Sequence, residues 1–78
     1  MKLIKYTKTF INKKPKYRLL FKSENGEYKV ITNADFLFDD NLDIFDKVKD
    51  LIIGRNYEIR YSLFFKNKII EFKEVLWL

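Results

Sequence analysis

The chain has 78 residues, with 16 Lys and Arg against 11 Asp and Glu for a net charge of +5, and it contains neither Cys nor His. This length supports one domain with a modest core. The missing residue types exclude disulfides, Cys- or His-ligated zinc, Cys or His nucleophiles and a Ser-His-Asp arrangement. A hydrophobic content of 47% with 18% aromatic residues is far from a disordered composition. We therefore expect residues 1–78 to form a single folded domain with a core of aromatic rings.

The charge is unevenly distributed along the chain. Residues 1–34 hold nine Lys or Arg against Glu24 and Glu27, which gives +7, whereas residues 35–50 hold six Asp against Lys47 and Lys49, which gives −4. An uneven distribution of this kind indicates a surface with a basic and an acidic side, and a basic side suits a polyanionic partner.

The N-terminal residues MKLIK lack the long apolar stretch of a signal peptide, and no apolar run of 18 residues occurs. We expect a soluble, cytoplasmic protein without a membrane partner. The abundance of Lys, Asn, Ile and Phe is what an AT-rich genome encodes, and a small chain of this composition suits a phage or mobile element.

Residues 2–11 alternate in the manner of a first strand, with Ile4, Tyr6 and Phe10 on one side and Lys5, Thr7 and Thr9 on the other. A basic loop, Asn12 to Pro15, follows.

The stretch KYRLLFKSENGEYKVI, residues 16–31, predicts a hairpin with a two-residue type I′ turn at Asn25-Gly26. This turn sets Phe21 opposite Val30 and Lys22 opposite Lys29. Strand alternation then gives two faces. One face carries Tyr17, Leu19, Phe21, Tyr28 and Val30, and the other carries Arg18, Leu20, Lys22, Lys29 and Ile31.

The helical spacing of Leu42, Phe45, Val48 and Ile52 predicts a helix over about 41–53, capped by Asn41 or Asp40 and closed by Gly54.

Residues 57–65 alternate again, and a tight Asn67-Lys68 turn predicts a second hairpin with Phe65 opposite Ile70 and Leu63 opposite Phe72. The element order is β-β-β-α-β-β. The apolar side of these strands predicts a core that includes Leu19, Phe21, Val30, Ile59, Leu63 and Phe72.

With this order, a long first strand and the segment IIGRNYEI (residues 52–59) after the helix, the chain resembles the OB fold, whose helix lies between strands three and four. The resemblance covers the whole length and depends on these features, none of which is a specific motif. It implies a mostly β, α+β architecture, a small five-stranded OB-like barrel, and oligonucleotide or oligosaccharide binding through the sheet and the loop after strand one.

The candidate nucleic-acid-binding residues are the cations and amphipathic rings of this predicted sheet: Lys13, Lys14, Lys16, Tyr17, Arg18, Lys22, Tyr28 and Lys29. Cations neutralise phosphates and rings stack on bases. For Tyr17 and Tyr28 a stacking role and a core role both remain open, whereas Phe21 is favoured as core. Lys5 and Lys8 extend the basic track if the first three strands are adjacent.

We expect a protein that is not an enzyme, with no cofactor and no metal, because the carboxylates lack a companion catalytic motif. The segment DDNLD, Asp39 to Asp43, starts like a calcium loop but has Ile44 where that loop needs Gly.

Two functions remain open. The first is sequence-tolerant binding of single-stranded DNA or RNA through the basic and aromatic sheet. The second is a protein-binding module, an inhibitor or adaptor, that docks through its acidic helix or its C-terminus VLWL, where Trp77 serves either as core or as an interface anchor.

Overall fold

The computed structural model describes residues 1–38 and 40–76 of the chain. It confirms a mostly β protein with the predicted order β-β-β-α-β-β and adds one short 3-10 turn, η1. The elements are β1 (Lys2–Ile11), β2 (Lys14–Lys22), β3 (Tyr28–Thr32), η1 (Asn33–Asp35), α1 (Asn41–Val48), β4 (Tyr57–Tyr61) and β5 (Ile69–Glu74).

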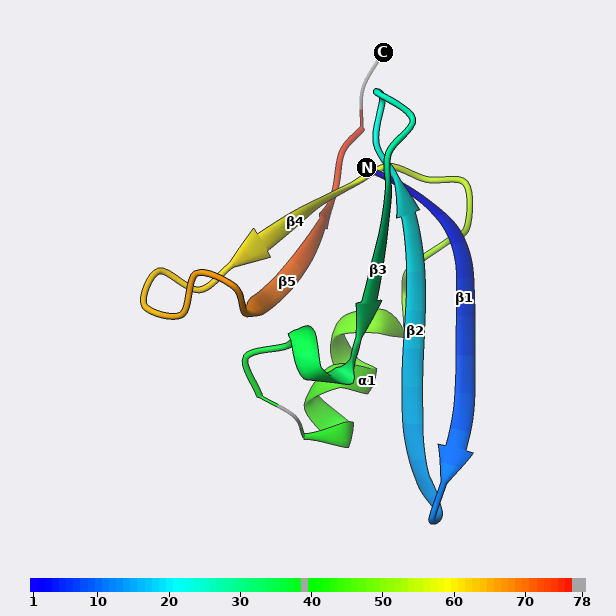
Figure 1. Cartoon of the computed structure of the whole chain (residues 1–78), viewed down its shortest axis with the longest axis vertical. Coiled ribbons are helices and arrows are strands. Elements are labelled where there is room, and N and C mark those ends of the chain that lie inside the picture. The colour runs from blue at the N-terminus through cyan, green and yellow to red at the C-terminus, as the bar shows by residue number, and fades with distance from the viewer. Residues whose placement is uncertain (39, 77–78) are drawn as a thin grey trace.

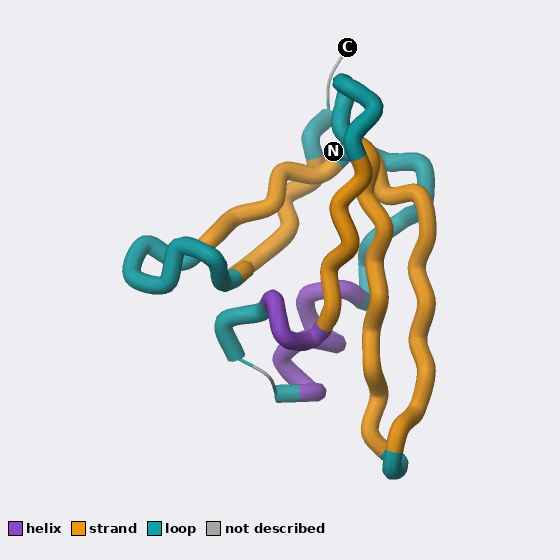
Figure 2. The backbone as a smooth tube through the Cα atoms, viewed as in Figure 1, coloured by secondary structure: helices purple, strands orange, loops and turns teal. Residues whose placement is uncertain are grey.

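The strands form two antiparallel sheets, one with the order β1-β2-β3 and one that pairs β4 with β5 (Figure 1). Isolated backbone bridges connect the regions of the two sheets at two places. At the start of β1, Lys2 bridges Asn56, and the Tyr57 N–H donates to the Met1 carbonyl at 2.7 Å. After η1, Phe36 bridges Ile69 in parallel. Figure 2 shows the two sheets diverging from the first contact, with the helical segments between them on the lower side.

The core lies between the two sheets and α1. Its buried hydrophobic residues come from nearly every element: Leu3, Tyr17, Leu19, Phe21, Ile31, Phe36, Ile44, Val48, Tyr57 and Ile69. The rings of Phe21 and Phe72 stack at 5.6 Å between centroids, so β2 packs directly on β5. The prediction of a core built from aromatic rings is confirmed at this contact.

The β2–β3 hairpin forms where predicted, but its register differs by one residue. Phe21 lies opposite Lys29 and Leu20 opposite Val30, because the loop has three residues instead of two. The Ser23 hydroxyl accepts the Glu27 N–H at 3.1 Å, and within this loop only Gly26 takes a positive φ, +85°. This is a three-residue hairpin loop with a glycine bulge, the other turn that Asn-Gly supports.

The shift moves every β3 side chain to the opposite face. Ile31 is fully buried, whereas Val30 is 43% exposed and Tyr28 61% exposed. The prediction that Val30 is core is therefore wrong, and Ile31, the larger side chain, takes that place. Leu19 and Phe21 are fully buried as predicted, and Ile59 and Phe72 pack against the core while partly buried.

The predicted basic loop between β1 and β2 is only a two-residue turn. Asn12 and Lys13 take positive φ values of 52° and 65°, and Ile11 pairs with Lys14. Pro15 lies within β2, opposite Phe10. It is tolerated there because β3 ends at Thr32, opposite Arg18, and so leaves no ladder on that side of Pro15.

The helix begins as predicted and ends earlier, at Val48. Asp40 is its cap, since the side chain accepts the Leu42 N–H at 2.8 Å. The chain leaves the helix because the segment that follows pairs with β1, where the Gly54 N–H donates to the Leu3 carbonyl at 2.8 Å. The buried helix residues are Ile44 and Val48, whereas Leu42 and Phe45 of the predicted apolar series are exposed.

The β4–β5 hairpin has a longer loop than predicted. β4 ends at Tyr61, and the tight Asn67-Lys68 turn is replaced by a loop over residues 62–68. The Ser62 hydroxyl accepts the N–H groups of Phe64 and Phe65 at 3.3 and 3.2 Å, which curls the chain out of the strand. The predicted burial of Leu63 is wrong, because its side chain is 87% exposed.

Within the described residues, no helix combines the length and the hydropathy needed to cross a membrane. Trp77, which the sequence analysis left as either core or interface anchor, lies outside the described residues, as does Asp39 of the acidic segment.

Candidate nucleic-acid interface

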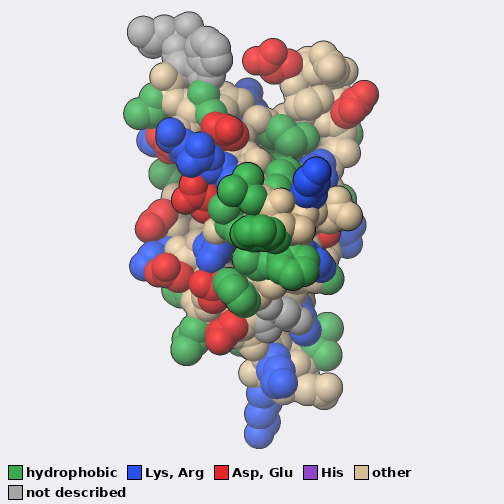
Figure 3. All heavy atoms as spheres, turned by 90° about the vertical axis from the view of Figure 1, so that its left-hand side faces the viewer, with side chains coloured by type: hydrophobic (Ala, Val, Ile, Leu, Met, Phe, Trp, Pro, Cys, Tyr) green, Lys and Arg blue, Asp and Glu red, His purple; other side chains and the backbone are tan. Residues whose placement is uncertain are grey.

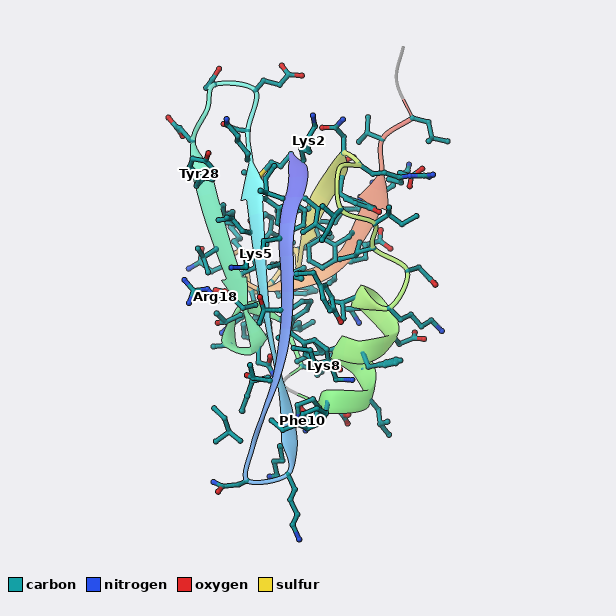
Figure 4. The ribbon with its side chains drawn as sticks, turned by 90° about the vertical axis from the view of Figure 1, so that its right-hand side faces the viewer. Lys2, Lys5, Lys8, Phe10, Arg18 and Tyr28 are labelled. Carbon is teal, nitrogen blue, oxygen red and sulfur yellow. The ribbon has the colours of Figure 1, made fainter. Side chains whose placement is uncertain are left out.

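One face of the three-stranded sheet points away from α1 and the core. Figure 4 shows Lys5, Arg18 and Tyr28 directed to this side, and Lys8 and Phe10 directed to the side of the helix. The strand register assigns the members of the outward face, which we call the basic face: Lys2, Lys5, Thr7, Thr9, Ile11, Lys14, Lys16, Arg18, Leu20, Lys22, Tyr28, Val30 and Thr32.

The pairing explains why the cations gather there. A bulge between Leu3 and Lys5 shifts the alternation of β1, so that Lys5 lies opposite Leu20 while Lys2 lies opposite Lys22. In β2 the even-numbered residues point outward and the odd-numbered Tyr17, Leu19 and Phe21 point into the core. Alternation thus places the basic residues of both strands on one surface.

Most of the predicted site residues lie on the basic face. Lys14, Lys16, Arg18, Lys22 and Tyr28 belong to it, and Lys13 lies in the turn at the tip of the β1–β2 hairpin.

The structure removes Tyr17 and Lys29 from this set. Tyr17 is only 3% exposed and meets Tyr6 edge-on at 6.3 Å, so the core role that had remained open is the correct one. Lys29 lies opposite Phe21, and its Nζ lies 5.9 Å from the centre of the Tyr61 ring. Lys22 therefore does not oppose Lys29. Instead it opposes Tyr28, whose ring centre lies 5.4 Å from the Lys22 Nζ.

Lys8 also leaves the basic track that the sequence suggested. Its Nζ lies between 5.2 and 5.5 Å from the ring centres of Phe10, Tyr17 and Phe45, on the side of α1. Cation–π attraction here ties the hairpin to the helix.

The strands of the basic face supply cations and no carboxylate, and the nearest carboxylates lie at its ends, where Glu24 lines a hollow with Lys2 and Lys22 and Asp35 accepts the Thr32 N–H. Strands Lys2–Ile11, Lys14–Lys22 and Tyr28–Thr32 contribute no carboxylate to it. The four ion pairs found in residues 1–38 and 40–76 join Lys47 to Asp43, Lys49 to Asp46, Arg55 to Glu74 and Arg60 to Glu71. All of them lie after β3, so none involves a cation of the basic face.

Two adjoining hollows mark the middle of this face. One, of about 380 Å³, is lined by Lys5, Thr7, Arg18 and Leu20. The other, of about 500 Å³, shares Thr7 and Arg18 and continues along Thr9, Lys16 and Thr32 towards η1. Guanidinium, ammonium and hydroxyl donors around shallow hollows are groups that bind phosphate oxygens.

Asn33 fixes the end of the basic face that lies next to η1. The sequence analysis did not predict this role. Asn33 is 5% exposed, its Oδ1 accepts the Tyr17 N–H at 2.7 Å, and its Nδ2 donates to the Pro15 carbonyl at 3.3 Å. It thus substitutes for a ladder partner where β3 has ended.

Lys5 lies on the basic face, as the predicted basic track had placed it. Lys2 was not part of the prediction, because its position depends on its pairing with Lys22.

Beneath the sheet, burial and then the neighbouring Tyr17 raise the pKa of the Tyr6 hydroxyl above its usual value of 10.0. Tyr6 therefore stays uncharged at neutral pH, and the charge of this region comes from its Lys and Arg residues.

Among the residues that the structure describes, no group of three His, Cys, Asp or Glu side chains is arranged to hold a metal ion.

Comparisons with protein-family models, with curated proteins and with solved structures found no match to this chain.

Proposed function

We propose that this protein binds single-stranded nucleic acid through the basic face and acts as a binding protein, not as an enzyme. The observation that carries the proposal is the gathering of six cations on one sheet face, from strands that contribute no carboxylate to it: Lys2, Lys5, Lys14, Lys16, Arg18 and Lys22. Such a surface attracts a polyanion because each phosphate contact releases condensed counterions.

We further propose that the two sheets belong to an OB-like barrel. The support is the position of the two bridges between the sheets, one from the start of β1 to the residue before β4 and one, parallel, from Phe36 to β5. These are the contacts by which a five-stranded sheet of this order turns back on itself. In such barrels the outer face of strands two and three carries the ligand, and here that is the basic face.

The chemistry of the basic face favours sequence-tolerant binding. Tyr28 supplies an exposed ring on which a base can stack, and Leu20 and Val30 lie between the cations. Lys and Arg contacts to phosphates position a strand without reading its sequence. A single strand also fits better than a duplex, because unpaired bases present their rings to the sheet.

The test is the salt dependence of binding to fluorescently labelled oligo-dT and oligo-U, measured by anisotropy. For single strands, log K falls with log salt by about 0.7 per phosphate contact. Replacing Lys5 and Arg18 together by Gln removes two contacts, so the slope should flatten by about 1.4.

The matched control replaces Arg60 and Lys73 by Gln. Both are exposed residues of the other sheet, and their loss lowers the net charge by the same two units. The control should keep the wild-type slope. If the salt slope flattened equally in both variants, net charge would govern binding. If the wild type did not bind either oligonucleotide at low salt, the proposal would be contradicted.

The alternative, a protein-binding module acting through the acidic helix, has less support in the described residues. Two of the helix carboxylates are paired within the helical segment, Asp43 with Lys47 at 2.8 Å and Asp46 with Lys49 at 3.0 Å. These pairs reduce the acidic character of α1, whereas the basic face has no such neutralisation. Loss of a protein partner in helix variants, together with absent oligonucleotide binding, would favour this alternative.

A further inference from the structure

The β4–β5 hairpin projects from the body of the molecule and exposes three consecutive large apolar residues at its loop, Leu63, Phe64 and Phe65 (Figure 1). Two contacts bring the segment before α1 beside this loop. The Lys68 Nζ donates to the Ala34 carbonyl at 2.7 Å, and the Leu37 N–H donates to the Ile69 carbonyl at 2.9 Å.

Two further exposed apolar residues, Phe38 and Leu42, follow this segment. We call the five residues Phe38, Leu42, Leu63, Phe64 and Phe65 the apolar patch. Figure 3 shows hydrophobic side chains gathered on the face of the molecule from which the hairpin projects.

The apolar patch is larger than a monomer ordinarily leaves in water. The exposed fractions are 61% for Phe38, 83% for Leu42, 87% for Leu63, 90% for Phe64 and 62% for Phe65. With about 200 Å² for an aromatic side chain and slightly less for leucine, these fractions correspond to about 700 Å² of apolar surface. The largest patch on a typical monomer is about 300–600 Å², whereas a standard interface buries about 800 Å² per partner. The size of the patch therefore fits a protein interface.

The charges at the two ends of the apolar patch have opposite signs. Lys66 and Lys68 belong to the loop beside Phe64 and Phe65, and Asp40 and Asp43 flank Leu42 at the start of α1. A two-fold axis through the middle of the patch places the loop of one copy against the helix start of the other. Lysines then face aspartates at both ends, which makes the patch complementary to itself.

We propose that the chain forms a symmetric homodimer through the apolar patch, with Lys66 of each copy facing Asp43 of the other. An anionic membrane is a poorer occupant, because Asp40 and Asp43 at the edge of the patch would be repelled by it. The loop projects sideways from the basic face, so both basic faces stay open in the dimer. The proposal is independent of nucleic-acid binding.

The first test is the mass of the protein in solution by analytical ultracentrifugation over a range of concentrations in low salt. The wild type should sediment with twice the monomer mass. Phe64→Ser should shift the protein to the monomer by raising the dissociation constant at least tenfold. The Phe64 side chain is almost wholly in solvent within one copy, so the variant should keep the wild-type circular dichroism and thermal midpoint.

The matched control is Phe10→Ser, which removes an exposed Phe from the β1–β2 hairpin tip and should leave the dimer intact. A wild type that stays monomeric at every concentration overturns the proposal. Vesicles of phosphatidylserine and phosphatidylcholine, and labelled oligo-dT, then show whether a lipid surface or a base occupies the patch instead.

A charge exchange tests the arrangement of the two copies. Lys66→Glu and Asp43→Lys should each weaken self-association at least tenfold, because like charges then meet at both ends. Lys66 is chosen because Lys68 is bonded to Ala34, and Asp43 because Asp40 caps the helix. Asp43 also pairs with Lys47 of its own copy at 2.8 Å, so the circular dichroism and thermal midpoint of Asp43→Lys are measured beside its self-association. An equimolar mixture of the two variants restores opposite charges at both ends and should form a heterodimer. Single variants that dimerise like the wild type, or a mixture that stays monomeric, would overturn the arrangement.

Discussion

Phe21 is the residue at which the two sheets contact each other. Its ring stacks on Phe72 of β5 and meets Tyr57 of β4 edge-on at 6.5 Å, and Phe72 in turn meets Phe36 edge-on at 5.8 Å. Four rings from four segments thus form the centre of the core. Aromatic pairs in these arrangements stabilise a fold beyond the area that they bury.

Replacing Phe21 by Ala should therefore lower the free energy of unfolding by about 3–5 kcal/mol, because the cavity left between the sheets cannot close easily. This is a large part of the roughly 5–15 kcal/mol that stabilises a small domain. Chemical denaturation monitored by circular dichroism measures the change. Val30→Ala is the control on the neighbouring strand, and it should cost about 1 kcal/mol or less because Val30 is half-exposed. Equal effects of the two substitutions would contradict the assigned hairpin register.

Asn33 allows a second test at the residue scale. Asn33→Ala leaves the buried Tyr17 N–H and the Pro15 carbonyl without their side-chain partner, which should cost about 1–3 kcal/mol. Asn67→Ala, an exposed Asn in the loop over residues 62–68, is the control and should change stability little. If the two variants unfold at the same denaturant concentration, the hydrogen bonds of Asn33 do not secure the end of β2.

At the scale of elements, hydrophobic alternation predicted the existence and order of every strand, and β1 begins and ends where the sequence indicated. The registers and loop lengths were harder to predict, because they depend on single hydrogen bonds. Asn25-Gly26 supports a two-residue or a three-residue loop, and the bond from the Glu27 N–H to the Ser23 hydroxyl accompanies the longer one. The one additional residue in the longer loop decides whether Val30 or Ile31 enters the core.

The dependence of loop length on single hydrogen bonds also explains why the loop of the β4–β5 hairpin is longer than predicted. The alternation of residues 57–65 continues past Tyr61, but the Ser62 hydroxyl binds two following N–H groups and ends the strand there. The predicted placement of site residues on one sheet face is confirmed where it depended on the alternation of β2, as at Arg18 and Lys22, whereas their binding role stays a prediction. The predicted placement was wrong where it depended on the β3 register, as at Lys29, and it left open whether Tyr17 belongs to the core.

The helix cap gives a test at this scale. Asp40→Ala removes the acceptor for the N–H groups of Leu42 and Asp43 and should lower the free energy of unfolding by about 0.5–2 kcal/mol. Asp40→Asn keeps an acceptor oxygen and should cost less. Thermal and chemical denaturation measure both variants. A larger loss in Asp40→Asn than in Asp40→Ala would contradict the capping role.

On the scale of the whole molecule, the charge separation along the sequence becomes a separation in space. The basic face lies on one side of the three-stranded sheet, and α1 with its aspartates lies on the other (Figure 4). The core lies between the two surfaces, so the nucleic acid that we propose as the ligand of the basic face would not contact the helix. This arrangement lets a polyanion approach one side of the molecule without repulsion from the carboxylates of α1.

The most direct test of this account is an NMR titration of the ¹⁵N-labelled protein with oligo-dT in low salt, which follows each backbone amide separately. The account predicts that the shifts concentrate on outward-facing residues of the three-stranded sheet, among them Lys5, Thr7, Arg18 and Val30, while Ile44 and Val48 of α1 stay unchanged. Shifts confined to α1 or to the loop over residues 62–68, or no shifts at saturating oligonucleotide, would contradict it.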